Sequence, residues 1–148
     1  PQSTIDRIQL LTKFHDIGKV GIPDEILKKP GPLSDDEWKI VRTHCNIGER
    51  IANESHELKE IAPLILRHHE RYDGKGYPLG LCGQDIPIEC RILTLVDSFD
   101  AMTNDRPYRK ALPTQVAVEE LLRYKNTQFD GGLTDLFIEL IQKEDTPT

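Results

Sequence analysis

Cysteine is scarce in this 148-residue chain, which contains only Cys45, Cys82 and Cys90. Their number is odd and no two of them have C-x-x-C spacing, which excludes a disulfide framework and a zinc ribbon. Long apolar runs are also missing, since none approaches the about 18 residues that a membrane helix requires. No signal peptide is recognisable. These absences predict a cytoplasmic chain with reduced thiols and no segment inserted in a membrane.

An excess of positive charge is missing too, because the formal net charge is −6 at pH 7. General affinity for DNA, RNA or an anionic membrane requires the opposite sign, so these partners are excluded. A small anionic ligand is not excluded, because a few local cations can hold one. The composition, 37% hydrophobic and 30% charged, is that of an ordinary globular protein, and the length fits one domain.

Apolar residues recur at helical spacing through most of the chain, and no stretch alternates with period two. The segment from Ser34 opens with a capping box, since Glu37 follows three residues later. Two segments rich in glycine and proline, 20–33 and 72–87, are predicted to be loops, the first with one short turn at 24–28. The predicted helices are 5–14, 34–52, a segment from Pro63 to the histidine pair, 87–102, 113–124 and 133–143. The sequence therefore predicts an all-α bundle of about six helices with a Gly/Pro-rich loop.

Histidines and carboxylates occupy positions where helices meet loops or where an apolar face is expected. Taken singly, each histidine has a structural explanation, since a buried imidazole often only donates to a backbone carbonyl. Asp97 is harder to explain in this way. It is predicted to lie in the middle of a helix beside the buried side, where an unpaired carboxylate costs several kcal/mol. It therefore requires a cation.

Taken together, the donors indicate a metal site, because each lies on or beside the inward face of a predicted helix. Imidazole and carboxylate without thiolate suit Zn, Mn, Fe, Co or Ni. The set is large enough for two divalent ions about 3.5–4 Å apart, with Asp16 bridging them. The alternative is a buried polar network without metal. The six candidate ligands are His15, Asp16, His44, His68, His69 and Asp97.

Cations and an aromatic residue lie near these ligands in the sequence. Lys19 follows His15 by four residues, and two arginines, Arg106 and Arg109, follow the helix of Asp97. Guanidinium groups match phosphate, and Tyr77 offers a flat face to a base. The alternatives are a solvated lysine and a tyrosine that only packs its loop. The combination predicts phosphoester hydrolysis by a metal-activated hydroxide, with no Walker loop and no GxGxxG motif to indicate other nucleotide chemistry.

Three long motifs occur in order: "HDIGKVGIPDEILKKPGPL", "HHERYDGKGYPLGLCGQDIP" and "RILTLVDSFDAMTNDRPYRKAL". With them the chain resembles the HD-GYP family of HD metal-dependent phosphohydrolases from about Leu10 to Phe129. The resemblance implies an all-α HD bundle and a bacterial signal-transduction enzyme. Its expected activity is hydrolysis of cyclic di-GMP to linear pGpG, GMP or both.

The resemblance also implies roles for single residues. His15 and Asp16 match the HD pair, and the other four candidate ligands match further metal ligands of the family. Lys19 matches the lysine near the phosphate, and Asp100 matches a further site carboxylate that orients water, so Asp16, Lys19 and Asp100 are the expected catalytic residues. The expected substrate-binding residues are Lys19, Asp73, Gly76, Tyr77, Pro78, Arg106 and Arg109.

One departure from the family concerns the segment before His15. Family members carry a helix upstream of the HD pair that supplies another ligand, whereas only 14 residues precede His15 and Asp6 is their sole carboxylate. We expect residues 1–148 to be a single HD-GYP catalytic domain that lacks its N-terminal helix or helices and any sensory or receiver domain. The expected partners are cyclic di-GMP, other signalling proteins and a second copy of the chain. Two alternatives remain open: a non-catalytic cyclic-dinucleotide sensor or interaction module, and hydrolysis of another nucleotide phosphoester.

Overall fold

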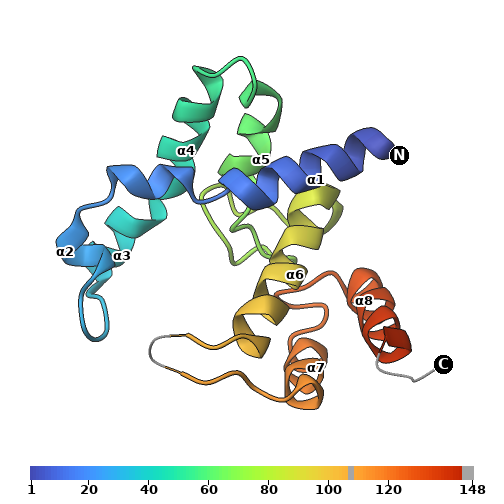
Figure 1. Ribbon diagram of the computed structural model, residues 1–148. Helices are drawn as coiled ribbons and strands as arrows, with labels where there is room; N and C mark the ends of the chain where they lie inside the picture. The colour runs from blue at the N-terminus through green and yellow to red at the C-terminus, as the bar shows by residue number, and fades with distance from the viewer. Residues whose placement is uncertain (107–108, 145–148) are drawn as a thin grey trace.

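The structure, a computed structural model, describes residues 1–106 and 109–144 and confirms the prediction of an all-α fold (Figure 1). Within these ranges no β-strand is present, only isolated bridges between pairs of residues. The α-helices are α1 (Gln2–Phe14), α2 (Asp24–Leu27), α3 (Asp35–Arg42), α4 (His44–Asn53), α5 (Ala62–Arg67), α6 (Ile88–Thr103), α7 (Thr114–Arg123) and α8 (Gly131–Glu144). Short 3-10 helices lie at η1 (Ile17–Gly21), η2 (Lys59–Ile61) and η3 (Gly83–Asp85). No described helix combines the length and the apolar composition that a membrane span requires.

Two hydrophobic clusters form the core, and α6 contributes to both. The first cluster gathers α1, α4, α5 and the N-terminal half of α6 around Leu11, Ile65 and Leu93. The second gathers α7, α8 and the part of α6 from Leu95 onward around Leu95 and Leu121. Figure 1 shows α6 running from beneath α1 toward α7. This long helix therefore joins the two halves of the bundle.

The apolar residues of α6 do not form one continuous buried stripe. Ile88 and Val96 are 42% and 41% exposed, whereas Cys90 and Leu93 are buried. The reason is that α6 packs against α1 near its start and against α7 near its end. Its buried face therefore changes along its length, which a single helical period does not describe.

The predicted helix 34–52 is interrupted at Thr43. The backbone N–H of Thr43 donates to the carbonyl of Ile40, three residues back, and its hydroxyl donates to the same oxygen at 2.5 Å. The chain turns there, so that His44 at the start of α4 is buried while Ile40 on α3 is exposed. The predicted capping box at the other end of α3 is confirmed, because Ser34 and Glu37 exchange hydrogen bonds of 2.9 and 3.1 Å.

Two glycines allow η1 to lie against α4. A Cβ atom on Gly18 would overlap the carbonyl oxygen of His44 and the backbone nitrogen of Gly48. Only glycine permits backbones to approach this closely. The contact brings Asp16, two residues before Gly18, to the start of α4.

Candidate metal and phosphate site

Three histidines are oriented in the same way by the ends of their helices. In each of His15, His44 and His68, Nδ1 lies within hydrogen-bond distance of the backbone carbonyl three residues earlier. Because a carbonyl only accepts, Nδ1 carries the hydrogen, and in the neutral ring Nε2 keeps its lone pair. This arrangement fixes the tautomer and ring orientation that a metal ligand requires. The acceptors are the carbonyls of Thr12, Val41 and Ile65, at 2.9, 2.7 and 2.6 Å.

The three Nε2 atoms converge on Asp16. Its Oδ2 lies 3.2 Å from Nε2 of His15, and its Oδ1 lies 3.7 Å from Nε2 of His44 and 3.8 Å from Nε2 of His68. The Nε2 atoms of His44 and His68 are themselves only 3.4 Å apart. Two lone pairs so close repel one another unless a proton or a cation lies between them. The donor set therefore fits a divalent metal ion held by imidazole and carboxylate.

His69 and Cys45 complete this cluster. The ligand atoms of His44, Cys45, His68 and His69 all lie within 4.8 Å of one another. Cys45 was not among the predicted ligands, because the cysteines show no metal-binding spacing. Burial raises the pKa of the Cys45 thiol to about 12, so that without a metal the group stays protonated at neutral pH.

The electrostatics of the cluster keep the carboxylate of Asp16 charged and the imidazoles of His44 and His69 neutral. Burial opposes ionisation of Asp16, yet the neighbouring imidazoles of His15 and His68 and the charge of Lys19 lower its pKa well below the usual range. Burial, followed by the charges of His68 and His44, lowers the pKa of His69 to about 3, and burial also lowers the pKa of His44. The hydrogen bond to Asp16 raises the pKa of His15. An ionised carboxylate with neutral imidazoles is the state that binds metal.

Asp97 differs from its prediction in one respect. Its expected burial was wrong, because Asp97 is exposed, whereas Leu93 one turn earlier on α6 is buried. The side chain nevertheless lines a cavity of about 120 Å³ together with His15, His68 and His69. Asp97 therefore lies at the rim of the histidine cluster and is not part of the core.

The loop after the histidine pair is organised by Glu70, which sequence reasoning did not assign to any role. Glu70 is only 3% exposed, and its carboxylate accepts the backbone N–H groups of Leu79, Gly80 and Leu81 at 2.7, 2.7 and 3.3 Å. A carboxylate directly after His68 and His69 was the available signal. Its buried position shows that the loop is held to the site from inside.

Tyr77 is the member of the loop that contacts the histidines. Its ring stacks on the ring of His69, with 5.0 Å between the ring centres and an interplanar angle of 14°. The guanidinium of Arg42 lies over the ring of Tyr77, 5.2 Å from its centre. Burial raises the pKa of Tyr77 to about 12. Gly76 lies so close to the carbonyl of His69 and to the backbone of Arg71 that no Cβ fits. These contacts press the loop against the histidines.

The other predicted loop residues lie farther from the histidines. Asp73 binds its own loop, accepting from Arg71 at 2.9 Å and from the N–H of Lys75 at 3.0 Å. Pro78 is exposed and follows Tyr77 through a cis peptide bond. A second cavity, of about 240 Å³, lies between this loop and the histidine pair. Its lining includes Tyr77 and Gly76 but neither Asp73 nor Pro78.

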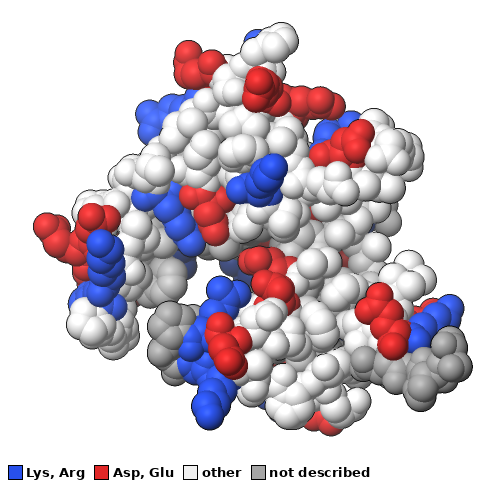
Figure 2. Space-filling view, viewed as in Figure 1, with Lys and Arg blue, Asp and Glu red and all other residues white. Residues whose placement is uncertain are grey.

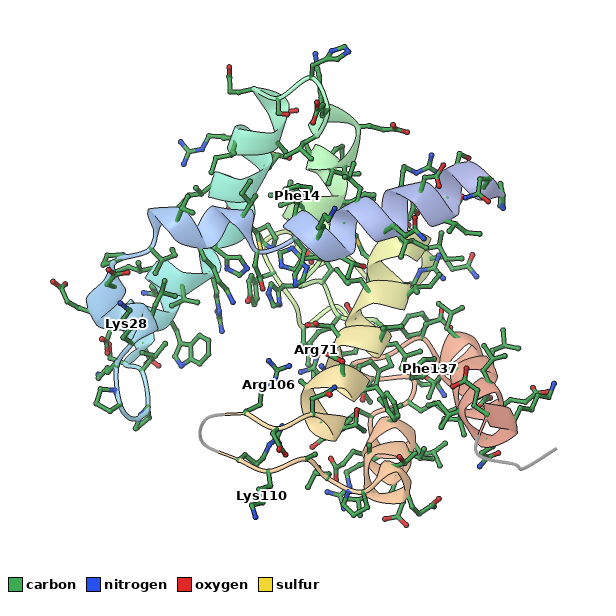
Figure 3. All side chains as sticks on the ribbon, viewed as in Figure 1. Phe14, Lys28, Arg71, Arg106, Lys110 and Phe137 are labelled. Carbon is green, nitrogen blue, oxygen red and sulfur yellow. The ribbon has the colours of Figure 1, made fainter. Side chains whose placement is uncertain are left out.

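The predicted cations divide into two groups. Lys19 is close to the cluster, with Nζ 3.4 Å from Oδ2 of Asp16. Arg106 and Arg109 lie beyond the end of α6, where Figure 2 shows Lys and Arg side chains gathered and Figure 3 labels Arg106 and Lys110. Neither arginine lines the two cavities at the histidines.

Asp100 lies beside Arg106, outside the two cavities at the histidines. It accepts from Asn104 at 2.8 Å, and its other oxygen lies 3.8 Å from Nη2 of Arg106. Arg109 donates to the carbonyl of Ala101 at 2.8 Å, and the backbones of Arg106 and Arg109 are paired. The three predicted residues thus lie together, and none of them lines the two cavities at the histidines. Residues 107 and 108 lie outside the described ranges.

Comparisons with known proteins agree with this geometry. Residues 3–133 match the model of the HD domain family. A cyclic di-GMP phosphodiesterase of Thermotoga maritima is 42% identical over 96% of this chain, and a 3'3'-cGAMP-specific phosphodiesterase of Vibrio cholerae is 41% identical over 93%. The chain spans 39% and 27% of the lengths of these relatives.

A solved structure of a cyclic GMP-AMP specific phosphodiesterase of V. cholerae shares the fold. Its TM-score is 0.62 at 22% sequence identity, and the match covers 92% of this chain and 32% of the other. At this identity the likeness establishes the helical architecture alone.

Proposed function

The chain belongs to the HD domain family, in its HD-GYP branch, and on this premise we propose that it is a metal-dependent phosphodiesterase that hydrolyses cyclic di-GMP. The products are linear pGpG, GMP or both. Several relatives that cover most of the chain bear the name cyclic di-GMP phosphodiesterase, at 35–42% identity. The acidic chain, with its few cations near the histidines, suits a small anionic substrate better than a nucleic acid.

The metal would be held by the six predicted ligands. In this proposal His15, Asp16, His44, His68, His69 and Asp97 bind two divalent ions of Fe, Mn, Ni, Co or Zn. When bound, such ions activate water near neutral pH and stabilise charge on a phosphate. The observation that carries the proposal is the approach of Asp16 Oδ1 to Nε2 of His44 and of His68, at 3.7 and 3.8 Å.

The chain's own residues have three further tasks. The backbone carbonyls that bind Nδ1 hold the imidazoles in the ligand tautomer. Nζ of Lys19 lies 3.4 Å from Oδ2 of Asp16, at the edge of the histidine cluster. A phosphate bound at the cluster would lie near this charge, so Lys19 neutralises one of its non-bridging oxygens. Arg106 and Arg109 bind the more distant phosphate, and Asp100 orients Arg106.

A pair of histidine variants tests the proposal. His69→Gln removes a ligand, whereas His56→Gln changes an exposed histidine outside the cluster. The assays are metal content by elemental analysis and hydrolysis of cyclic di-GMP, with Mn²⁺ or Fe²⁺ supplied and products separated by chromatography. We expect His56→Gln to behave like the parent chain and His69→Gln to lose metal and at least about a hundredfold in turnover, as at comparable metal sites.

Two outcomes would contradict the enzyme proposal. The first is a parent chain that neither retains transition metal nor hydrolyses the substrate when metal is supplied. The second is His69→Gln with unchanged turnover. Binding of cyclic di-GMP without turnover would favour the non-catalytic sensor instead.

A second candidate substrate is 3'3'-cGAMP. The observation that favours it is the 39–41% identity to three V. cholerae phosphodiesterases named as specific for this dinucleotide. The two substrates differ in one base and share both phosphodiester bonds. Parallel measurement of kcat/KM for each therefore decides between them.

A further inference from the structure

A third cavity, of about 390 Å³, lies beside the histidine cluster on the side of α3. Its wall consists of Asp35, Trp38, Lys39 and Arg42 from α3 and of Tyr77 from the loop. The spacing of the four α3 residues, i, i+3, i+4 and i+7, places them on one face of the helix. The volume falls within the range of small-molecule sites.

Packing of the core does not explain this face of α3. None of the residues of α3, all of which the structure describes, is buried, and Trp38 is 46% exposed. The helix is held instead by its capping box and by a 2.6 Å ion pair between Lys29 and Glu37. Single exposed aromatic residues are common, but this one shares its face with a carboxylate and two cations. Such a surface matches a flat ligand with polar edges.

The cavity adjoins the proposed catalytic site. Arg42 and Tyr77 line both this cavity and the 240 Å³ cavity that contains His68 and His69. Between them runs a stack in which Tyr77 lies on His69 and Arg42 lies over Tyr77. The proposed phosphate site and the cavity at Trp38 therefore share a wall, which Arg42 and Tyr77 form.

We propose that the cavity lined by Asp35, Trp38, Lys39 and Arg42 holds one guanine base of the substrate, an inference that rests on the proposed function. An indole stacks on any base, so Trp38 contributes affinity without selecting the base. Asp35 accepts hydrogen bonds only, which suits the N1–H and the amino group of guanine. Lys39 and Arg42 donate, which suits the O6 and N7 acceptors of guanine. Adenine offers a ring acceptor where guanine offers N1–H, so the carboxylate disfavours it.

The fluorescence of Trp38, the single tryptophan of the chain, reports on the cavity directly. The probes are GMP and AMP, which contain no phosphodiester bond and are not consumed. We expect GMP to quench the fluorescence saturably and to bind roughly tenfold tighter than AMP. Asp35→Asn should reduce this preference to about twofold or less. Asp36→Asn makes the same charge change in the same turn but lies outside the cavity, so it should retain the preference.

Hydrolysis of bis(p-nitrophenyl) phosphate, a diester without a base, tests the proposed function separately. If this diester and cyclic di-GMP are hydrolysed but GMP does not quench Trp38, the base site is refuted and the enzyme proposal stands. Equal GMP preference in Asp35→Asn and Asp36→Asn would also refute the base site. Guanine-selective quenching that Asp35→Asn abolishes supports the base site even if no diester is hydrolysed.

Discussion

Substitution of Gly18 by alanine should disrupt the site without touching any proposed ligand. The added methyl would overlap the carbonyl oxygen of His44 and the nitrogen of Gly48, and neither backbone atom can rotate aside. The contact must therefore open, which separates η1 from α4. Overpacking of this kind costs about 1–3 kcal/mol, a large part of the about 5–15 kcal/mol that typically stabilises a domain.

The same displacement carries Asp16 away from His44 and His68. Loss of positioning at a metal site typically reduces metal affinity by about 10–100-fold. We therefore expect Gly18→Ala to lower both the free energy of unfolding and the metal content of the purified protein. Urea unfolding followed by far-UV circular dichroism measures the first, and elemental analysis measures the second.

Gly132→Ala is the matched control. Gly132 is exposed on α8, and a Cβ atom there meets nothing closer than Oδ1 of Asp130 at 3.5 Å. Because alanine is the better helix former, this variant should be unchanged or more stable by about 0.5 kcal/mol. If Gly18→Ala unfolds at the same urea concentration as the parent chain and keeps its metal, the close contact of η1 with α4 is not as described.

Three other measurements test the surroundings of the site. Glu70→Ala leaves three loop N–H groups without their acceptor, so it should lower the free energy of unfolding by about 2 kcal/mol and raise KM for cyclic di-GMP. Glu70→Gln should lower the free energy of unfolding by less. An unchanged KM in Glu70→Ala would contradict the role of the loop. A thiol reagent at pH 8 should modify Cys82 rapidly in the native protein, and Cys45 and Cys90 only after unfolding. Cys45 and Cys90 are buried, and burial raises the pKa of each thiol to about 12. Rapid modification of all three thiols in the native protein would disprove this. For metal-free protein, burial lowers the pKa of His44 and of His69 below the usual 6.5, so the unfolded chain binds protons that the native chain does not. As the pH falls below about 6.5, the free energy of unfolding should then decrease by roughly 1 kcal/mol per pH unit, and the slope should flatten in His69→Gln. The raised pKa of His15 acts above this window, because below it His15 is protonated in both states.

The helical bundle was predictable because local signals are strong in this chain. The capping box of Ser34 and Glu37 predicts the start of α3, and Pro63 lies in the first turn of α5. The interruption at Thr43 was not predictable, since the apolar spacing continues through it. Beyond the break, α4 packs against η1 and α5, and the spacing of the apolar residues indicates neither contact.

The candidate site divides in the same way. The histidines and Asp16 could be nominated from their positions at helix ends, but Asp97 was expected to be buried and is exposed. Its exposure follows from the change of the buried face along α6, which packs into one core cluster near its start and into the other near its end. The residues next to Asp97 in the sequence do not indicate that change. The buried position of Glu70 likewise depends on a loop that folds back over it.

Residue order was enough to establish the helical class, the inventory of nitrogen and oxygen donors and the family, because periodicity, caps and motifs are short-range properties. The distances among Asp16, His44 and His68 required the folded chain, as did the cavity at Trp38. These features join segments separated by tens of residues, and their relative positions are set by the packing of backbone and side chains in the core.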